Sequence, residues 1–227
     1  MKFGGIVKSS TLDFPGKLCC VLFVLGCDLD CFYCHNRGLI DGSLQEMESG
    51  EIMSFLQKRK GLLDGVVISG GEPTIYPDLI DFIKLVKKIP YAVKLDTNGQ
   101  RPEVVEKIAG DRLADYFAVD YKASLEDYFD VCGDSGEKVL KSIDVLLRSN
   151  ADFEVRTTIY PGLGIEGLFK IASELPKLSR YRINMYKSPI TVKAGHAGLL
   201  KKEVLTQGEL EQALEKIKKI QPNTVLF

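Results

Sequence analysis

Short runs of apolar residues alternate with longer amphipathic segments along most of the chain. The short runs predict strands, because nearly continuous apolar residues such as Val66–Ile68 are typical of strands buried on both faces of a parallel sheet. The longer segments repeat apolar residues every three or four positions, which predicts helices. The predicted strands are 18–24, 65–69, 92–96, 116–120, 153–159 and 181–186. The predicted helices are 48–60, 77–88, 102–109, 136–149, 165–174 and 207–220.

The regular alternation of strand and helix predicts an α/β fold with parallel strands joined by right-handed crossovers. Two architectures fit this pattern: an open doubly wound sheet, and a partial (β/α)6 TIM-like barrel of parallel strands. Periodicity does not distinguish between them. No linker or sharp change of composition interrupts the chain. We therefore expect a single domain over residues 1–227, with a barrel core at about 18–187, an N-terminal extension at 1–17, and a C-terminal loop and helix at 188–227.

Polar residues gather at or near the ends of five predicted strands, in the segments 69–72, 96–98, 120–122, 156–158 and at Asn184. In both architectures ligands bind at the carboxyl ends of the strands. Helix caps and turns also favour such residues. Five clusters in succession nevertheless predict a functional rim.

The composition is that of a soluble globular protein, with 45% hydrophobic residues and a formal net charge of -1. This balance argues against a protein that neutralises the phosphates of nucleic acids. The longest apolar run, Leu18–Leu25, is less than half of the roughly 20 residues that cross a bilayer. We expect a cytoplasmic protein with no membrane and no nucleic-acid partner, in a compartment where thiols stay reduced.

Three cysteines, Cys27, Cys31 and Cys34, lie within eight residues directly after the first predicted strand. A structural zinc site needs four ligands, and the fourth would have to be His35 or a distant cysteine. An iron–sulfur cluster with one open iron fits three thiolates better. Structural zinc and a redox-active or bystander thiol group remain the alternatives. The chain has only two histidines, which excludes a multi-histidine metal centre.

The spacing Cys27-x3-Cys31-x2-Cys34, with an aromatic residue before the last cysteine, resembles the signature of radical S-adenosylmethionine (SAM) enzymes. The resemblance implies that these cysteines bind a [4Fe–4S] cluster and that SAM chelates its fourth iron. The segments 13–16 (DFPG) and 33–36 (YCHN) resemble the glycyl-radical-enzyme activases, such as the pyruvate formate-lyase activating enzyme. The segment 4–13 resembles the anaerobic ribonucleoside-triphosphate reductase activating proteins.

The same resemblance assigns cofactor-binding roles to nine rim residues: Gly70, Gly71, Glu72, Asp96, Thr97, Asn98, Asp120, Lys122 and Arg156. The GGE segment would hold the amino group of SAM. The two aspartates and the threonine would surround a monovalent cation beside the SAM carboxylate, which the lysine and the arginine would approach. No catalytic residue is expected beyond the cluster and SAM. The remaining cysteines, Cys19, Cys20 and Cys132, are expected to pack in the core.

The function implied by the resemblance is that of a radical SAM oxidoreductase. It would reductively cleave SAM to a 5′-deoxyadenosyl radical, which abstracts hydrogen from a glycine of a partner glycyl radical enzyme. The expected partner is anaerobic ribonucleoside-triphosphate reductase, and the expected electron donor is a flavodoxin or ferredoxin. The alternatives are a radical SAM enzyme that acts on a small molecule, similar to the 7-carboxy-7-deazaguanine synthases, and a non-catalytic metal-binding module.

Overall fold

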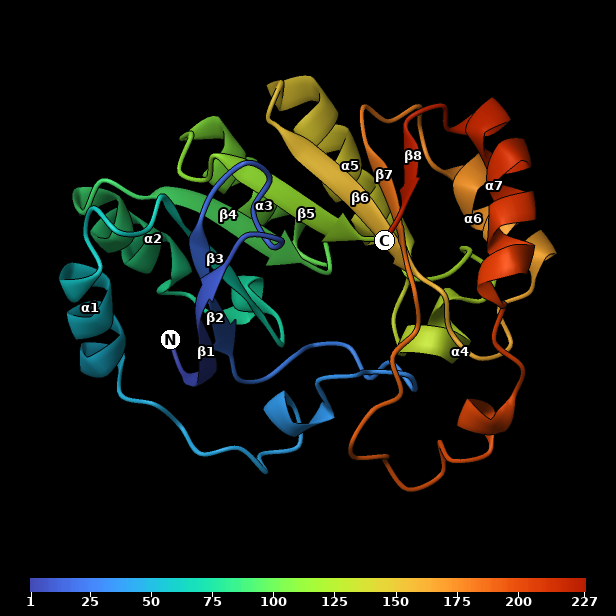
Figure 1. Cartoon of the computed structure of the whole chain (residues 1–227), viewed down its shortest axis with the longest axis horizontal. Helices are drawn as coiled ribbons and strands as arrows, with labels where there is room; N and C mark the ends of the chain where they lie inside the picture. The colour runs from blue at the N-terminus through green and yellow to red at the C-terminus, as the bar shows by residue number, and fades with distance from the viewer.

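The computed structural model describes residues 1–227, whose eight strands form one sheet in the order β1 to β8 (Figure 1). A doubly wound sheet reverses its strand order at a switch point, whereas each strand here lies between its sequence neighbours. The order therefore confirms the partial barrel. The strands are β1 (Phe3–Ser10), β2 (Cys19–Val24), β3 (Gly65–Gly70), β4 (Ala92–Thr97), β5 (Tyr116–Asp120), β6 (Phe153–Thr158), β7 (Tyr181–Asn184) and β8 (Thr224–Leu226).

The six predicted strands correspond to β2–β7, which are all parallel. Two further strands, at the edges of the sheet, are not among those predicted. β1 pairs antiparallel with β2, and β8 pairs parallel with β7. Neither has a buried apolar run, because Phe3 is the only buried residue of β1 and β8 has three residues. The sheet thus extends into both the N-terminal and C-terminal segments that were expected to flank the core.

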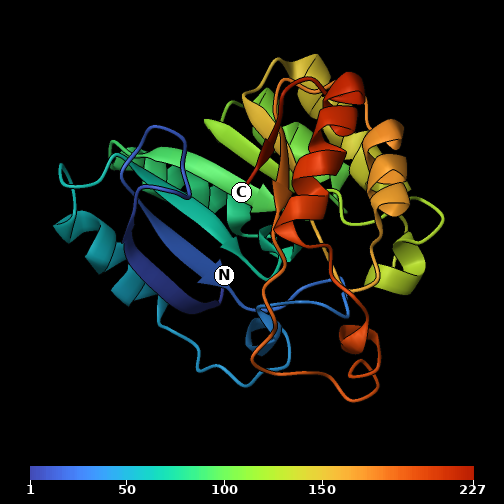
Figure 2. The ribbon, with the colours of Figure 1, turned by 45° about the vertical axis from the view of Figure 1, so that its right-hand side comes forward.

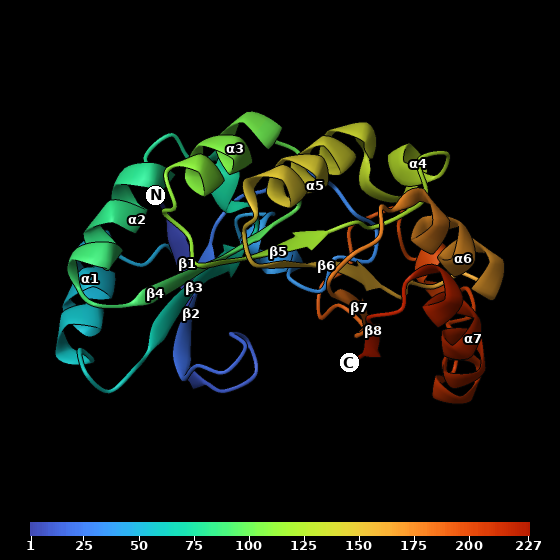
Figure 3. The same ribbon diagram turned by 90° about the horizontal axis from the view of Figure 1, so that it is seen from above.

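The six predicted helices are confirmed to within two residues at each end. They are α1 (Ser49–Lys58), α2 (Leu79–Lys88), α3 (Pro102–Gly110), α5 (Glu137–Ser149), α6 (Ile165–Glu174) and α7 (Gln207–Ile220). A seventh helix, α4 (Tyr128–Cys132), is too short to show an amphipathic period and is not predicted. Figure 3 shows the helices on the convex side of the curved sheet. None of them is long and apolar enough to span a membrane.

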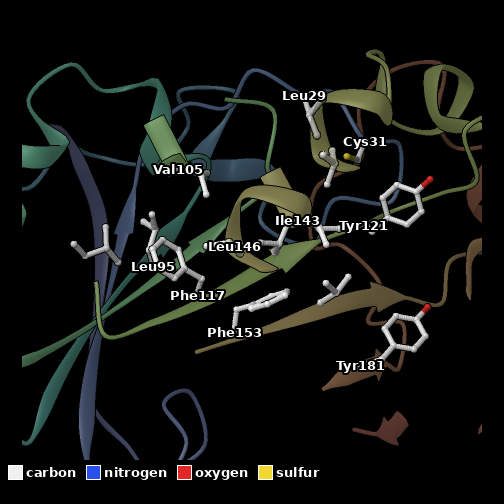
Figure 4. Close-up of a cluster of buried hydrophobic side chains, with 14 of the residues drawn as sticks. Leu29, Cys31, Leu95, Val105, Phe117, Tyr121, Ile143, Leu146, Phe153 and Tyr181 are labelled. Atoms are coloured by element: carbon white, nitrogen blue, oxygen red, sulfur yellow. The ribbon is translucent and has the colours of Figure 1, made fainter. Parts of the chain in front are cut away.

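The main hydrophobic core lies between the convex side of the sheet and the helices (Figure 4). Leu95 and Phe117 of neighbouring strands are fully buried there together with Ile143 and Leu146 of α5. Successive side chains of a strand point to opposite faces. The residues that alternate with Leu95 and Phe117 along these strands therefore face the concave side. This alternation separates an apolar exterior layer from the interior in which the functional residues lie.

The side chains on the concave side change from apolar to charged along the strands. A small apolar cluster of Phe14, Cys19, Val21 and Val67 fills one end. The loop that joins β1 to β2 lies against this end and accepts a hydrogen bond at the Asp13 carbonyl, 2.7 Å from Lys94 Nζ. Toward the carboxyl ends of the strands the side chains become charged. The interior therefore leads from a closed apolar end to an open polar one.

Candidate functional site

A cavity of about 570 Å³ lies at the carboxyl ends of the strands. All twelve residues that the sequence singled out as metal or cofactor ligands line it: Cys27, Cys31, Cys34, Gly70, Gly71, Glu72, Asp96, Thr97, Asn98, Asp120, Lys122 and Arg156. They come from the loop after β2 and from the ends of β3, β4, β5 and β6. The structure thus brings the predicted rim together at one place.

The loop that carries the three cysteines is held by a buried arginine. Arg37 donates one hydrogen bond to the Cys31 carbonyl at 2.8 Å and another to Asp30 Oδ1 at 2.6 Å. A second attachment joins the loop to the segment after β7, where His35 Nδ1 lies 3.1 Å from the Ser188 carbonyl. Figure 2 shows this later segment passing on the same side of the molecule as the cysteine loop. Arg37 was not among the predicted residues, because its partner Asp30 lies seven residues earlier and no local pattern marks the pair.

The three thiols differ in their surroundings. Burial raises the pKa of Cys27 to about 12 and also raises the pKa of Cys34. The pKa of Cys31 is lowered instead, because its sulfur interacts with the neighbouring Cys132 side chain. Cys132 is buried as expected, but it contacts a predicted ligand rather than only packing in the core.

The donor set of the cavity can be compared with the metal groups considered above. No group of three or more His, Cys, Asp or Glu side chains is arranged around the position of a single metal ion. The structure thus does not display the four-ligand arrangement of a structural zinc site. Three thiols that line one cavity do fit the thiolate ligation of a [4Fe–4S] cluster. With three cysteine ligands, one iron is left for another ligand.

Gly70 and Gly71 are required by close packing of the backbone. Gly70 has a φ of +117°, and a Cβ there would lie 2.3 Å from the Val24 nitrogen. A Cβ on Gly71 would lie 1.8 Å from the Gly26 carbonyl oxygen. The lack of a side chain at both positions therefore allows the end of β3 to pack directly against the end of β2 and the start of the cysteine loop. Glycine at a strand end permits close approach of the backbone, and here the group approached is the protein's own backbone.

Glu72 is fully buried and connects the ends of β3 and β4. Its Oε1 accepts hydrogen bonds from the Thr74 amide and hydroxyl and from the Thr97 hydroxyl. Its Oε2 accepts one from the Asn98 amide at 2.6 Å. Burial raises the pKa of Glu72 to about 7, although these donors oppose the shift. Because each carboxylate oxygen has two acceptor positions, Oε2 retains one, and Glu72 lines the cavity.

Asn98 links this network to the cysteines. Its side-chain amide donates to Asp28 Oδ1 at 2.8 Å and lies 3.8 Å from the Cys27 sulfur. Its own side-chain oxygen accepts from the Gln100 amide in a turn. The turn chemistry and the contact with the cysteine loop thus coexist in one residue.

A second network of charged side chains lines the other wall of the cavity. The Arg156 guanidinium bridges two aspartates, with Nε 2.8 Å from Asp120 Oδ1 and Nη1 3.1 Å from Asp96 Oδ2. Lys122 Nζ lies 3.0 Å from Asp120 Oδ2. Burial alone would raise the pKa of Asp120, but Arg156 and Lys122 hold it well below its usual range. Burial opposes the same shift at Asp96, but Arg156 and Lys94 lower the pKa of Asp96, so both aspartates are charged at neutral pH.

Sequence reasoning missed two members of this network, Lys94 and Glu154. Lys94 Nζ lies 2.9 Å from Asp96 Oδ1 and 3.9 Å from Glu154 Oε1, and both side chains are almost completely buried. The missed signal is the period of two: Lys94 precedes Asp96 by two residues, and Glu154 precedes Arg156 by two. Residues i and i+2 of a strand share one face, so a charge next to a rim residue at this spacing faces the interior.

Comparisons with known proteins agree with this arrangement. The sequence profile of the radical SAM superfamily matches residues 21–175. A protein of Methanocaldococcus jannaschii that carries the provisional name glycyl-radical enzyme activating enzyme is 36% identical over 81% of this chain and 79% of its own length. The 7-carboxy-7-deazaguanine synthase of Methanothermobacter thermautotrophicus is 27% identical over 66% of this chain and 64% of its own. The crystal structure of Streptococcus suis SuiB bound to SAM has a TM-score of 0.66 at 18% identity, and the match covers 91% of this chain but 51% of SuiB.

Proposed function

The chain belongs to the radical SAM superfamily, and on this premise we propose that it binds a [4Fe–4S] cluster through Cys27, Cys31 and Cys34 and cleaves SAM reductively. The observation that carries the proposal is the single cavity lined by these thiols and by all nine predicted cofactor-binding residues. When bound, the cluster supplies the electron that breaks a carbon–sulfur bond of SAM, which yields methionine and a 5′-deoxyadenosyl radical. The protein supplies binding, orientation and electrostatics.

The Glu72 network supports binding of the SAM amino group. The free acceptor position on Glu72 Oε2 offers a buried negative charge to an ammonium group, and an ion pair in such a site compensates the cost of burial. Gly70 and Gly71 contribute indirectly, because they hold the end of β3 against the cysteine loop. The amino site and the thiols thereby keep a fixed spacing.

The charged network supports binding of the SAM carboxylate. Arg156 and Lys122 are the cationic side chains of the cavity wall, and a guanidinium is suited to carboxylate recognition. A monovalent cation in this place would need Asp96 and Asp120 as ligands. Both carboxylates already pair with cationic side chains. These pairs compete with a cation for the two carboxylates, so a monovalent cation beside Asp96, Thr97 and Asp120 stays a prediction.

We propose that the substrate is a glycine of a partner glycyl radical enzyme. Support comes from the provisionally named activating enzyme, which is 36% identical over most of both chains. The segment 4–13 favours anaerobic ribonucleoside-triphosphate reductase as the partner, and flavodoxin or ferredoxin is the proposed electron donor. The protein would act as an activase.

A radical SAM enzyme acting on a small molecule is the second candidate, favoured by the identity to the 7-carboxy-7-deazaguanine synthase. Such an enzyme needs polar groups for a second small ligand. Arg182 lines the cavity, but its Nε donates to Asn184 Oδ1 at 2.8 Å and its guanidinium lies 3.3 Å from the centre of the Phe227 ring. We prefer the activase function because this arginine is already engaged and because the provisionally named activating enzyme is more similar to the chain than the synthase is.

Anaerobic mixing of the reconstituted protein with SAM, a reductant and the candidate reductase tests the proposal. We expect a glycyl-radical doublet in the EPR spectrum together with 5′-deoxyadenosine in matching amounts. A reductase in which the radical-bearing glycine is replaced by alanine is the control and should give no doublet. Cleavage of SAM without a radical on any glycyl radical enzyme would favour the small-molecule function. Protein that takes up neither iron nor sulfide and leaves SAM intact would overturn both.

A further inference from the structure

Cys132 lies outside the cysteine motif but is fixed directly against its middle member. It ends α4 and is fully buried. Two main-chain hydrogen bonds flank Cys31, from the Asp30 amide to the Cys132 carbonyl at 2.9 Å and from the Phe32 amide to the Val131 carbonyl at 3.2 Å. They set the register between the cysteine loop and α4. The backbone therefore holds the buried Cys132 side chain beside Cys31.

Two buried phenol groups beside this pair of sulfurs have no hydrogen-bond partner. The hydroxyls of Tyr33 and Tyr128 are both unpaired, and both side chains are buried. Each interacts electrostatically with Cys31 and Cys132. An unpaired buried hydroxyl is costly, and such groups in folded proteins are few. The two phenols thus point to an acceptor that is bound at this place.

Neither ring is free to turn away from the site. Tyr33 stacks on Tyr160 with ring centres 5.0 Å apart and an angle of 17° between the rings. Tyr128 packs against Tyr121 at 5.6 Å. Tyr33 lines the cavity together with Cys31, and Tyr128 lies on α4 four residues before Cys132. Sulfur atoms of a bound cluster are suitable acceptors for both.

We propose that Cys132, Tyr128 and Tyr33 form a layer of hydrogen-bond donors behind Cys31 that raises the reduction potential of the cluster. Hydrogen bonds to the sulfurs are one of the factors that set the potential of iron–sulfur clusters, and such outer groups tune a metal centre without binding it. One added electron makes the cluster more negative, so donors stabilise the reduced state more than the oxidised one. The three are positioning residues that act through sulfur, and the inference rests on the proposed cluster.

An anaerobic redox titration of the reconstituted protein without SAM, followed by EPR, tests the role of Cys132. We expect Cys132→Ala to lower the midpoint potential, with a tenfold change in the reduction equilibrium corresponding to ~59 mV for one electron. Cys132→Ser retains an O–H donor and should keep most of the wild-type potential. Cys20→Ala removes another fully buried thiol, from β2, and should leave the potential unchanged. A structural effect alone would not separate the alanine from the serine variant in this way.

Tyr128→Phe provides a test that does not depend on the thiol. It removes one oxygen atom, and we expect a smaller shift in the same direction. Tyr91→Phe is the matched control, because its buried hydroxyl donates to the Leu56 carbonyl away from the cavity. If Cys132→Ala does not take up the cluster, the midpoint potential of Tyr128→Phe decides whether the donors raise the potential. Wild-type potentials in the variants that bind the cluster would overturn this inference alone, whereas failure of the wild-type protein to bind iron and sulfide would overturn the proposed function.

Discussion

The two walls of the cavity differ in how far their polar groups find partners within the chain. On the wall formed by β4–β6, every charge has a counter-charge within the chain: Arg156 bridges Asp96 and Asp120, and Lys122 pairs with Asp120. On the cysteine wall, Tyr33 and Tyr128 keep unpaired hydroxyls, and the three thiols face the cavity. The ionic wall also keeps oxygen atoms without a hydrogen-bond partner, on Asp96 and Glu154, but these lie beside cationic side chains, whereas the unpaired groups of the cysteine wall are hydroxyl donors.

This difference shows which parts of the site depend on the cofactor. An ionic network in which each charge lies beside a counter-charge is stabilised within the folded chain and can orient a ligand without further rearrangement. Buried donors without acceptors destabilise the chain until an acceptor arrives. Cluster binding would therefore stabilise the cysteine wall most. Substitutions on the two walls should consequently affect different quantities.

The largest effect is expected on the cysteine wall. Cys31→Ala removes one of three thiolates, and we expect loss of the [4Fe–4S] cluster and of SAM cleavage to below detection. Iron and sulfide analysis together with chromatography of 5′-deoxyadenosine measures both. Cys19→Ala removes a buried thiol of the small apolar cluster and should retain both the cluster and SAM cleavage. A Cys31→Ala protein with normal iron, sulfide and cleavage would contradict the assignment of the motif.

On the ionic wall the expected effect is on stability. Arg156→Ala leaves Asp96 and Asp120 without their shared partner, and removal of one member of a buried ion pair costs about 3–5 kcal/mol. Urea denaturation of the protein without cofactors at pH 7 measures this loss.

Arg148→Ala is the matched control for Arg156, because Arg148 pairs with Asp144 on the exposed surface of α5. Exposed pairs contribute about 0.2–1 kcal/mol. Equal losses in the two variants would show that Arg156 is not the central member of the network.

The same contrast explains what could be predicted from sequence. The rim residues were predictable because the motif and the strand ends are local patterns, and parallel strands carry such residues to one edge. Lys94 could have been predicted from its spacing of two residues from Asp96. Cys132 was not, because its role depends on the docking of a five-residue helix onto a loop about a hundred residues earlier. The edge strands β1 and β8 likewise depend on their partners rather than on their own apolar residues.

Glu72 lies between the two walls and should give the smallest effect, visible as a pH dependence. Its carboxyl has a pKa of about 7 in the folded protein against an ordinary value of 4.5. Between these values the folded state binds more protons than the unfolded state, so stability falls as pH rises. The full difference is about 3 kcal/mol. Glu72→Gln cannot ionise and should lack this decline.

Urea denaturation of cofactor-free wild-type and Glu72→Gln proteins from pH 4.5 to pH 8 measures the difference in unfolding free energy. We expect the wild-type protein to lose stability relative to the variant up to about pH 7 and to stay level above it. Glu106→Gln, at an exposed position of α3, should retain the wild-type decline. A difference that does not change with pH would mean that the network of Thr74, Thr97 and Asn98 keeps Glu72 ionised. The carboxylate would then be held as an anion within the folded chain, as Asp96 and Asp120 are by their cationic partners.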